Sequence, residues 1–108
     1  MAHEHPQLVQ VAAYRGVNAR ASYPIYGLRV RHGYHLVFRQ MSLVTLVDQS
    51  GAVVWIGVPD PSLTECPLFR GQQIEAWLLV QGGGLSWPRG KPPLFIMTQI
   101  GPGTFQLP

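Results

Sequence analysis

Two short segments of this sequence pair aromatic rings with cationic side chains. The first spans residues 31–35 and carries Arg31 with Tyr34, and the second spans residues 82–93 and carries Trp87 close to two further cations. Every nucleobase presents a π-face and every phosphate is negative, so a ring beside cations suits single-stranded nucleic acid. These segments therefore indicate a binding function whose chemistry is base stacking and phosphate contact.

Catalytic and metal-binding residues are poorly supplied. The chain has five carboxylates and four histidines, and it contains neither a G-x-x-x-x-G-K-[ST] phosphate loop nor a His-Glu-x-x-His motif. His32 and His35 have no third ligand nearby, whereas a structural metal needs three or four. The glycines at 82–84 are followed by prolines instead of a helix, so they predict a hairpin tip and no phosphate cradle. We expect no catalytic residue, no metal and no cofactor, and therefore no enzyme.

Charged residues are few and unevenly distributed. Only 12% of the residues are charged, against about 25% in an average globular domain, which leaves surface available for a partner. Residues 1–47 hold five basic side chains and one acidic one, whereas residues 48–108 hold three basic and four acidic ones. A basic first half is compatible with a polyanionic ligand.

Neither a secreted nor a membrane protein is indicated. The single cysteine, Cys66, excludes an intramolecular disulfide and a cage of thiol ligands. No apolar run approaches the roughly 20 residues that cross a bilayer, and the first residues lack the pattern of a signal peptide. We expect a soluble, cytoplasmic protein without membrane contact.

The elements that position the two segments are predicted to be strands. Twelve Gly and ten Pro interrupt the chain too often for long helices, and β-branched and aromatic residues fill the intervals. Gln49-Ser50-Gly51 predicts a hairpin turn, Gly27 predicts a bulge or bend, and the prolines of 59–70 permit one helical turn around Ser62 to Cys66. The predicted strands span 23–31, 36–48, 52–58, 72–81 and 94–101.

The first twenty residues fit two structures. Gln7 to Tyr14 is either an extra strand, with Val9, Val11 and Ala13 on one face, or a short helix that begins at Pro6 and ends at Gly16. The strand is favoured. Residues 1–20 are then an N-terminal extension, and residues 21–108 form one domain.

The order and spacing of the strands carry a family resemblance. It covers about residues 23–101 and rests on Ile25-Tyr-Gly-Leu-Arg-Val30, Met41 to Val54, Leu68 to Ile74 and Pro93 to Ile100. Its most specific part is the apolar strand that ends in Asp48-x-x-Gly51, with Gly71 further on. This pattern resembles the OB-fold nucleic-acid-binding domains of bacterial replicative polymerases, aminoacyl-tRNA synthetases and replication protein A. The resemblance implies an all-β fold, a five-stranded Greek-key OB barrel with an extra N-terminal segment.

The resemblance also implies where a ligand binds. OB domains bind across the second and third strands, between the loop joining strands one and two and the loop joining strands four and five. Here those loops are residues 31–35 and 82–93. Strand alternation adds Arg39, because Val44 and Leu46 are taken as inward and Arg39 then faces outward. The candidate nucleic-acid-binding residues are Arg29, Arg31, Tyr34, Arg39, Trp87, Arg89 and Lys91.

Alternation makes two of the predicted strands apolar on both faces. Large apolar side chains occupy both faces of 72–81 and of 94–101, which is unusual for the wall of a monomeric barrel. We therefore expect a homodimer or a protein partner. The candidate face for this contact consists of Trp77, Leu79, Phe95 and Met97.

Two functions follow from these observations. The first is a single-stranded nucleic-acid-binding OB-fold protein, with DNA favoured over RNA, that serves DNA replication or repair by stacking and phosphate contacts. The alternative is an OB-fold interaction subunit of a larger complex with little nucleic-acid affinity of its own. The aromatic and cationic loops favour the first function, and the low charge content favours the second.

Overall fold

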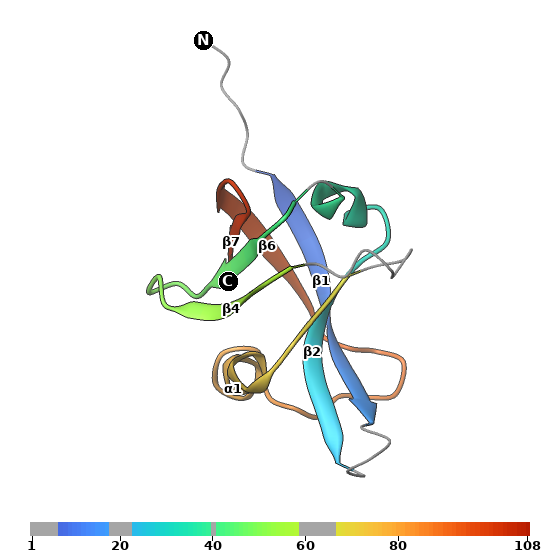
Figure 1. The fold of residues 1–108 in the computed structure, drawn as a ribbon. Helices are drawn as coiled ribbons and strands as arrows, with labels where there is room; N and C mark the ends of the chain where they lie inside the picture. Colours follow the sequence, from blue (N-terminus) through green and yellow to red (C-terminus); the bar gives the residue numbers. More distant parts are fainter. Residues whose placement is uncertain (1–6, 18–22, 40, 59–66) are drawn as a thin grey trace.

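The computed structural model describes residues 7–17, 23–39, 41–58 and 67–108, and the helical turn predicted around Ser62 to Cys66 lies outside these ranges. The expected β-barrel is confirmed: one seven-stranded sheet curls into a nearly closed barrel (Figure 1). Its strands are β1 (Leu8–Val17), β2 (Pro24–Val30), β3 (Val44–Val47), β4 (Val53–Gly57), β5 (Leu68–Arg70), β6 (Leu94–Gly101) and β7 (Thr104–Gln106).

The strand order around the barrel is β4-β3-β7-β6-β1-β2-β5. All neighbours pair antiparallel except β3 and β7, which run parallel. The barrel has seven strands where five were expected: four of the expected strands are present, 72–81 is not a strand, and the sheet also contains β1 and the unpredicted three-residue strands β5 and β7. The order leaves β4 and β5 as the two edges of the sheet.

The first strand confirms the strand interpretation of the N-terminal segment. Val9, Val11 and Ala13 are buried, as the predicted alternation requires. β1 lies between β2 and β6, however, and so is a central strand of the sheet. Leu8–Val17, within the segment predicted as an extension, is therefore part of the barrel.

The segment 72–81, predicted to be a strand, is instead the helix α1 (Gln72–Val80). Its buried residues are Ile74, Trp77 and Leu78, and this spacing of three and four residues is the period of a helix face. Both faces looked apolar under strand alternation because the helical period places apolar residues on both. α1 packs against β2 and against the edge strands β4 and β5 (Figure 1). It therefore covers the side of the barrel where the two edges of the sheet face each other.

The predicted strand 36–48 is a strand only over β3. Residues His35–Phe38 form a single 3-10 turn, η1, which buries Phe38 against the rings of Phe69 and Phe105, with centroid distances of 5.6 and 5.0 Å. Val44 and Leu46 are buried as predicted. Val47, which alternation places outward, is also buried, and the register of the β3–β4 pair shifts between Leu46 and Val47.

The same irregularity reverses the predicted faces at the start of β4. Val54 is buried and Val53 is exposed, although alternation had predicted the opposite. Trp55 is half-buried and packs on Phe69, with ring centroids 4.9 Å apart. Its predicted core position is therefore confirmed only in part.

Gly27 marks a close approach of two strands and not a bulge. The pairing of β2 with both β1 and β5 is regular through this residue. A Cβ atom at Gly27 would lie 2.6 Å from the Phe69 carbonyl oxygen on β5. Glycine is needed here because the backbone of β5 occupies the space of a side chain.

The turn between β6 and β7 docks the last strand against β3. Gly103 adopts a φ of +68°, and its carbonyl oxygen accepts a hydrogen bond of 2.8 Å from the Thr45 amide. Beyond β7, the Leu107 amide donates to the Val47 carbonyl at 2.8 Å. No helix in the described part of the chain is long and apolar enough to span a membrane.

Candidate nucleic-acid interface

The outer face of the β6-β1-β2-β5 section brings together the best candidates for ligand contact. Residues that pair across antiparallel strands share a face of the sheet. Ala12 of β1 pairs with Arg29 of β2 and also with Leu94 of β6. The arginine and the leucine therefore flank the alanine on the same face.

The next rows of this face add two more basic residues. The Arg31 amide donates a 2.9 Å hydrogen bond to the Gln10 carbonyl, which extends the β1–β2 pairing by one row. Gly27 pairs with Tyr14 on one side and with Arg70 of β5 on the other. Arg29, Arg31 and Arg70 are all exposed and form a basic stripe on the outer face of β2 and β5.

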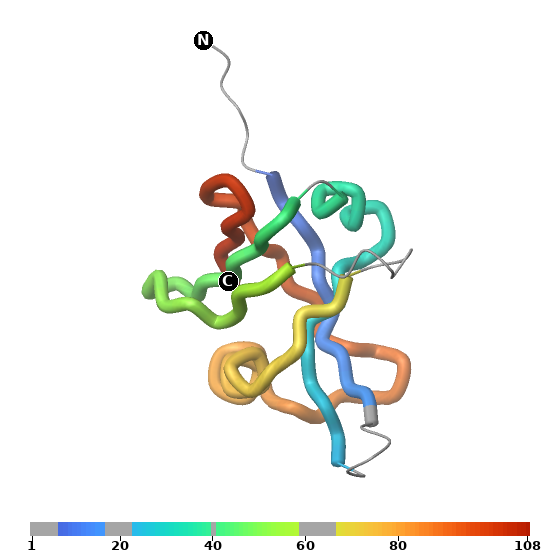
Figure 2. Tube along the Cα trace, in the orientation of Figure 1, coloured from blue at the N-terminus to red at the C-terminus, as the bar shows by residue number. Residues whose placement is uncertain are grey.

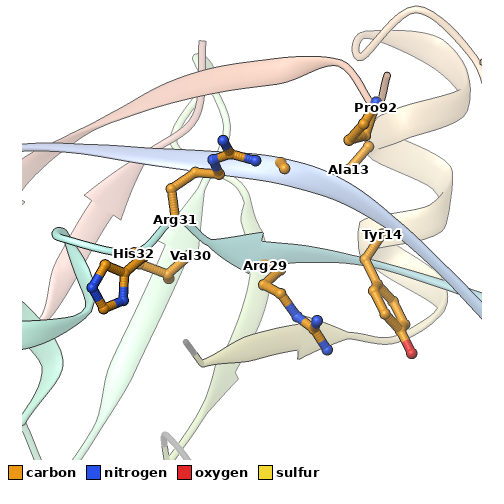
Figure 3. A pocket seen from close by; sticks show the side chains of 8 residues that line it. Ala13, Tyr14, Arg29, Val30, Arg31, His32 and Pro92 are labelled. Atoms are coloured by element: carbon orange, nitrogen blue, oxygen red, sulfur yellow. The ribbon is translucent and has the colours of Figure 1, made fainter. Parts of the chain in front are cut away.

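A pocket of about 390 Å³ opens on this face (Figure 3). Figure 2 shows the segment between α1 and β6 passing beyond β2 and β1 before it enters β6, and Pro92 of this segment reaches the pocket. The Ala13 amide donates to the Pro93 carbonyl at 2.9 Å, which holds the segment against β1. The pocket is lined by Ala12, Ala13, Tyr14, Arg29, Val30, Arg31, His32 and Pro92.

Tyr14 and Arg29 form the aromatic and cationic corner of the pocket. The Arg29 guanidinium lies over the Tyr14 ring at 4.8 Å from the centroid, and Figure 3 shows both side chains extending in the same direction. A Cβ atom at Gly16 would lie 2.9 Å from carbon atoms of the Tyr14 ring. The absent side chain at Gly16 therefore leaves the space that the ring occupies.

The loop after β2 carries the other polar residues of the pocket. His32 lines the pocket, and its ring stacks on that of His35 at 4.8 Å between centroids, with 26° between the planes. The Gly33 amide donates to Nδ1 of His35 at 3.1 Å, and the Tyr34 amide donates to the Arg31 carbonyl at 3.0 Å. These bonds define the conformation of the loop on the pocket rim.

Among the described residues, the charge around the pocket is positive. The described ranges contain seven basic side chains and two acidic ones, Asp48 and Glu75. Neither acidic residue lines the pocket. The Asp48 carboxylate accepts hydrogen bonds within its own turn, from the Ser50 hydroxyl and the Ala52 amide. An anionic ligand at Arg29 and Arg31 therefore meets no competing carboxylate from the described residues.

Only two of the predicted nucleic-acid-binding residues, Arg29 and Arg31, lie in the pocket. Arg39, Arg89 and Lys91 are exposed but do not line it.

The two predicted stacking rings, Tyr34 and Trp87, are half-buried and pack against the core. Trp87 contacts Tyr26 edge to face, with centroids 6.3 Å apart. Trp87 thus packs against the barrel instead of projecting freely from its loop.

The predicted partner face is largely internal. Trp77 and Met97 are buried, and Phe95 is half-buried with its ring 5.0 Å from that of Trp77. Leu79 is exposed, on the opposite side of α1. The prediction is wrong for Trp77 and Met97 because it assumed that 72–81 was a strand and took the wrong face of 94–101 as the outer one.

Sequence reasoning placed His32 in the first ligand-binding loop but missed Tyr14 and Arg70 as site residues. Once Val9, Val11 and Ala13 are assigned to the inner face of a strand, Tyr14 follows on the outer face. Its position beside Arg29 depends on the register between β1 and β2, which no local pattern specifies. Arg70 belongs to a strand too short to show alternation.

The described residues offer no metal site, since no three His, Cys, Asp or Glu side chains come together among them. The OB-fold resemblance stays a prediction that rests on sequence order and spacing. No protein-family model, no curated protein and no solved structure matches this chain.

Proposed function

We propose that this protein binds single-stranded nucleic acid, with DNA favoured, on the outer face of β1 and β2 and without catalysis. The observation that carries the proposal is the pocket between Arg29 and Arg31, which has an aromatic ring at one end and no acidic residue among the described residues of its lining. Guanidinium groups present planar sets of donors that match phosphate oxygens. An exposed pair of such groups favours a ligand with repeated negative charges.

The spacing of the two arginines supports a polymeric ligand. Arg29 lies in β2 and Arg31 directly follows the strand, so their backbones are about 6.8 Å apart along the strand direction. This separation is close to the distance between successive phosphates of an extended single strand. Arg70 on β5 continues the basic stripe toward the opposite end of β2.

The test is fluorescence anisotropy of a labelled twelve-nucleotide oligo-dT across a range of salt concentrations. Contacts to two or three phosphates predict that log K falls with log salt at a slope of about −1.4 to −2.1. Arg29→Ala and Arg31→Ala should each weaken binding and reduce the slope by about 0.7. Arg39→Ala is the matched control, since Arg39 is exposed and outside the pocket. Absence of binding at 50 mM salt and micromolar protein, or equal effects of all three substitutions, would contradict the proposal.

A second candidate function is assembly into a homodimer or a larger complex. It is favoured by the exposed apolar side chains of β4 and the residue after it, Val53, Ile56 and Val58, on an edge of the sheet. Uncharged edge strands are templates for pairing with another chain. Light scattering distinguishes the two functions: a dimer that resists dilution and binds no oligonucleotide supports assembly alone.

A further inference from the structure

The basic stripe runs beside an aliphatic one on the same sheet face. Ala12 pairs with Arg29 on β2 and with Leu94 on β6, and Gln10 lies between Arg31 and Ile96 in the neighbouring row. Leu94 is 49% exposed and Ile96 is 43% exposed. We call these two residues the aliphatic wall. The rows of Ala12 and Gln10 thus each have a cation on one side and an exposed aliphatic side chain on the other.

The strand between the two walls carries a small residue. Ala12 is 6% exposed and lines the pocket, so its methyl group is the floor between taller side chains on β2 and β6. Neighbouring strands are about 4.8 Å apart, so the backbones of Arg29 and Arg31 are about 9.6 Å from those of the aliphatic wall. We call these two arginines the cationic wall. Ala12 therefore has a charged side toward Arg29 and an apolar side toward Leu94, and β1 places Gln10 and Tyr14 on the same face before and after it.

A single nucleic-acid strand has the same two-sided chemistry. Its phosphates repeat along one edge, and the bases project from the sugars on the other edge with large apolar faces. The distance from a phosphate to the far side of its base is similar to the separation of the two walls. An aliphatic surface contacts the π-face of any base, whereas hydrogen-bonding groups are needed to read base identity.

We infer that single-stranded nucleic acid binds along β1 with its phosphates on Arg29 and Arg31 and its bases turned over Ala12 onto the aliphatic wall of Leu94 and Ile96. This orientation rests on the proposed function and goes beyond it, because phosphate binding alone specifies no side for the bases. It gives the aliphatic wall a role in affinity. It also predicts little preference among bases, since neither wall residue donates or accepts hydrogen bonds through its side chain.

The orientation is tested by separating the base contribution from the phosphate contribution. Anisotropy is measured for twelve-nucleotide oligo-dT and for an abasic deoxyribose-phosphate oligomer of equal length, with Leu94→Gln and Ile96→Gln variants. We expect each variant to weaken oligo-dT binding about threefold to tenfold through lost apolar contact, without a change in salt slope. The abasic oligomer should bind more weakly than oligo-dT to the unaltered protein. Its affinity should be the same for the unaltered protein and for both variants.

Ile56→Gln is the control, because Ile56 is an exposed aliphatic residue of β4, an edge strand that does not neighbour β1. Equal thermal midpoints by circular dichroism establish that each variant is folded. If oligo-dT and the abasic oligomer bind equally, or if the wall variants behave as Ile56→Gln does, the orientation is wrong and the proposed function stands. Poly-Glu of matched charge binding as tightly as oligo-dT also overturns it. If the unaltered protein binds neither oligomer, the proposed function itself fails.

Discussion

The guanidinium of Arg29 rests over the ring of Tyr14, 4.8 Å from its centroid, across the β1–β2 pair. A cation over an exposed ring is stabilised by about 0.5–1 kcal/mol. A guanidinium has five N–H donors, so donors remain for phosphate while its carbon lies over the ring. Tyr14 is thus a positioning residue for Arg29.

Replacing Tyr14 should weaken ligand binding through Arg29. We expect Tyr14→Leu to lower oligo-dT affinity about twofold to fivefold, the equivalent of the lost cation–π contact, and Tyr14→Phe to retain affinity because the ring remains. Anisotropy titrations of both variants at fixed salt provide the measurement. In an Arg29→Ala background, Tyr14→Leu should have no additional effect, and an additive loss there would contradict the positioning role.

Trp87→Ala should destabilise the fold. The half-buried indole packs on the core and on Tyr26, so its removal should lower the free energy of unfolding by about 2–3 kcal/mol. Urea denaturation followed by circular dichroism measures this loss. Trp87→Phe should recover part of the stability. Weaker oligo-dT binding by Trp87→Ala with an unchanged urea midpoint would instead show that the indole stacks on the ligand.

Gly103→Ala should be among the more damaging single substitutions. A side chain at φ +68° is strained, and a Cβ atom there would collide with the Leu43 carbonyl oxygen, so we expect a loss of at least about 2 kcal/mol. Gly83→Ala is the control, because Gly83 also has a positive φ but no atom within 4 Å of its Cβ position. That variant should lose only about 1 kcal/mol. Equal urea midpoints for the two variants would contradict the steric argument.

Acid should destabilise the β3–β4 hairpin through Asp48. The Ser50 hydroxyl, hydrogen-bonded to Oδ1 at 2.6 Å, is the main cause that lowers the pKa of Asp48, and backbone amides add to the effect. A lowered folded-state pKa contributes stability that is present above the unfolded-state pKa and is lost as pH falls through the folded value.

Urea midpoints measured from pH 5 downward should therefore decrease, and the decrease should be smaller in Asp48→Asn, which keeps the side-chain oxygen but does not titrate. An identical pH profile for the two proteins would show that other carboxylates dominate the acid response.

Strand signals in the sequence predicted much of the barrel. β2, β4 and β6 lie within predicted strands, and β1 was favoured over the helical alternative. The helix α1 was missed because the apolar residues of Gln72 to Gln81 fit both the period of a strand and the period of a helix. The segment is also too short for its length to distinguish a helix from a strand. β5 and β7 are too short to show a pattern, and they exist because neighbouring strands offer hydrogen-bonding partners.

The site was predictable only where charge alone indicated it. Arg29 and Arg31 lie in the predicted strand 23–31, within the basic half of the chain, and both were predicted to bind nucleic acid. Trp87 was predicted to stack on a ligand because it lies beside cations in a Gly- and Pro-rich loop. Its burial depends on where that loop crosses the barrel, which the sequence does not indicate. Tyr14 required the β1–β2 register, which is a property of the whole sheet.

The parallel pairing of β3 with β7 bears on how the chain is made. During synthesis, the β1–β2 and β3–β4 hairpins leave the ribosome long before β6 and β7, the strands that join them into one sheet. Until then the inner faces of both hairpins have no permanent cover, and contacts this distant in sequence are slow to form. We therefore expect the emerging chain to expose these apolar faces until β6 and β7 are made, and a pause before β6 to increase its aggregation more than a pause after β7.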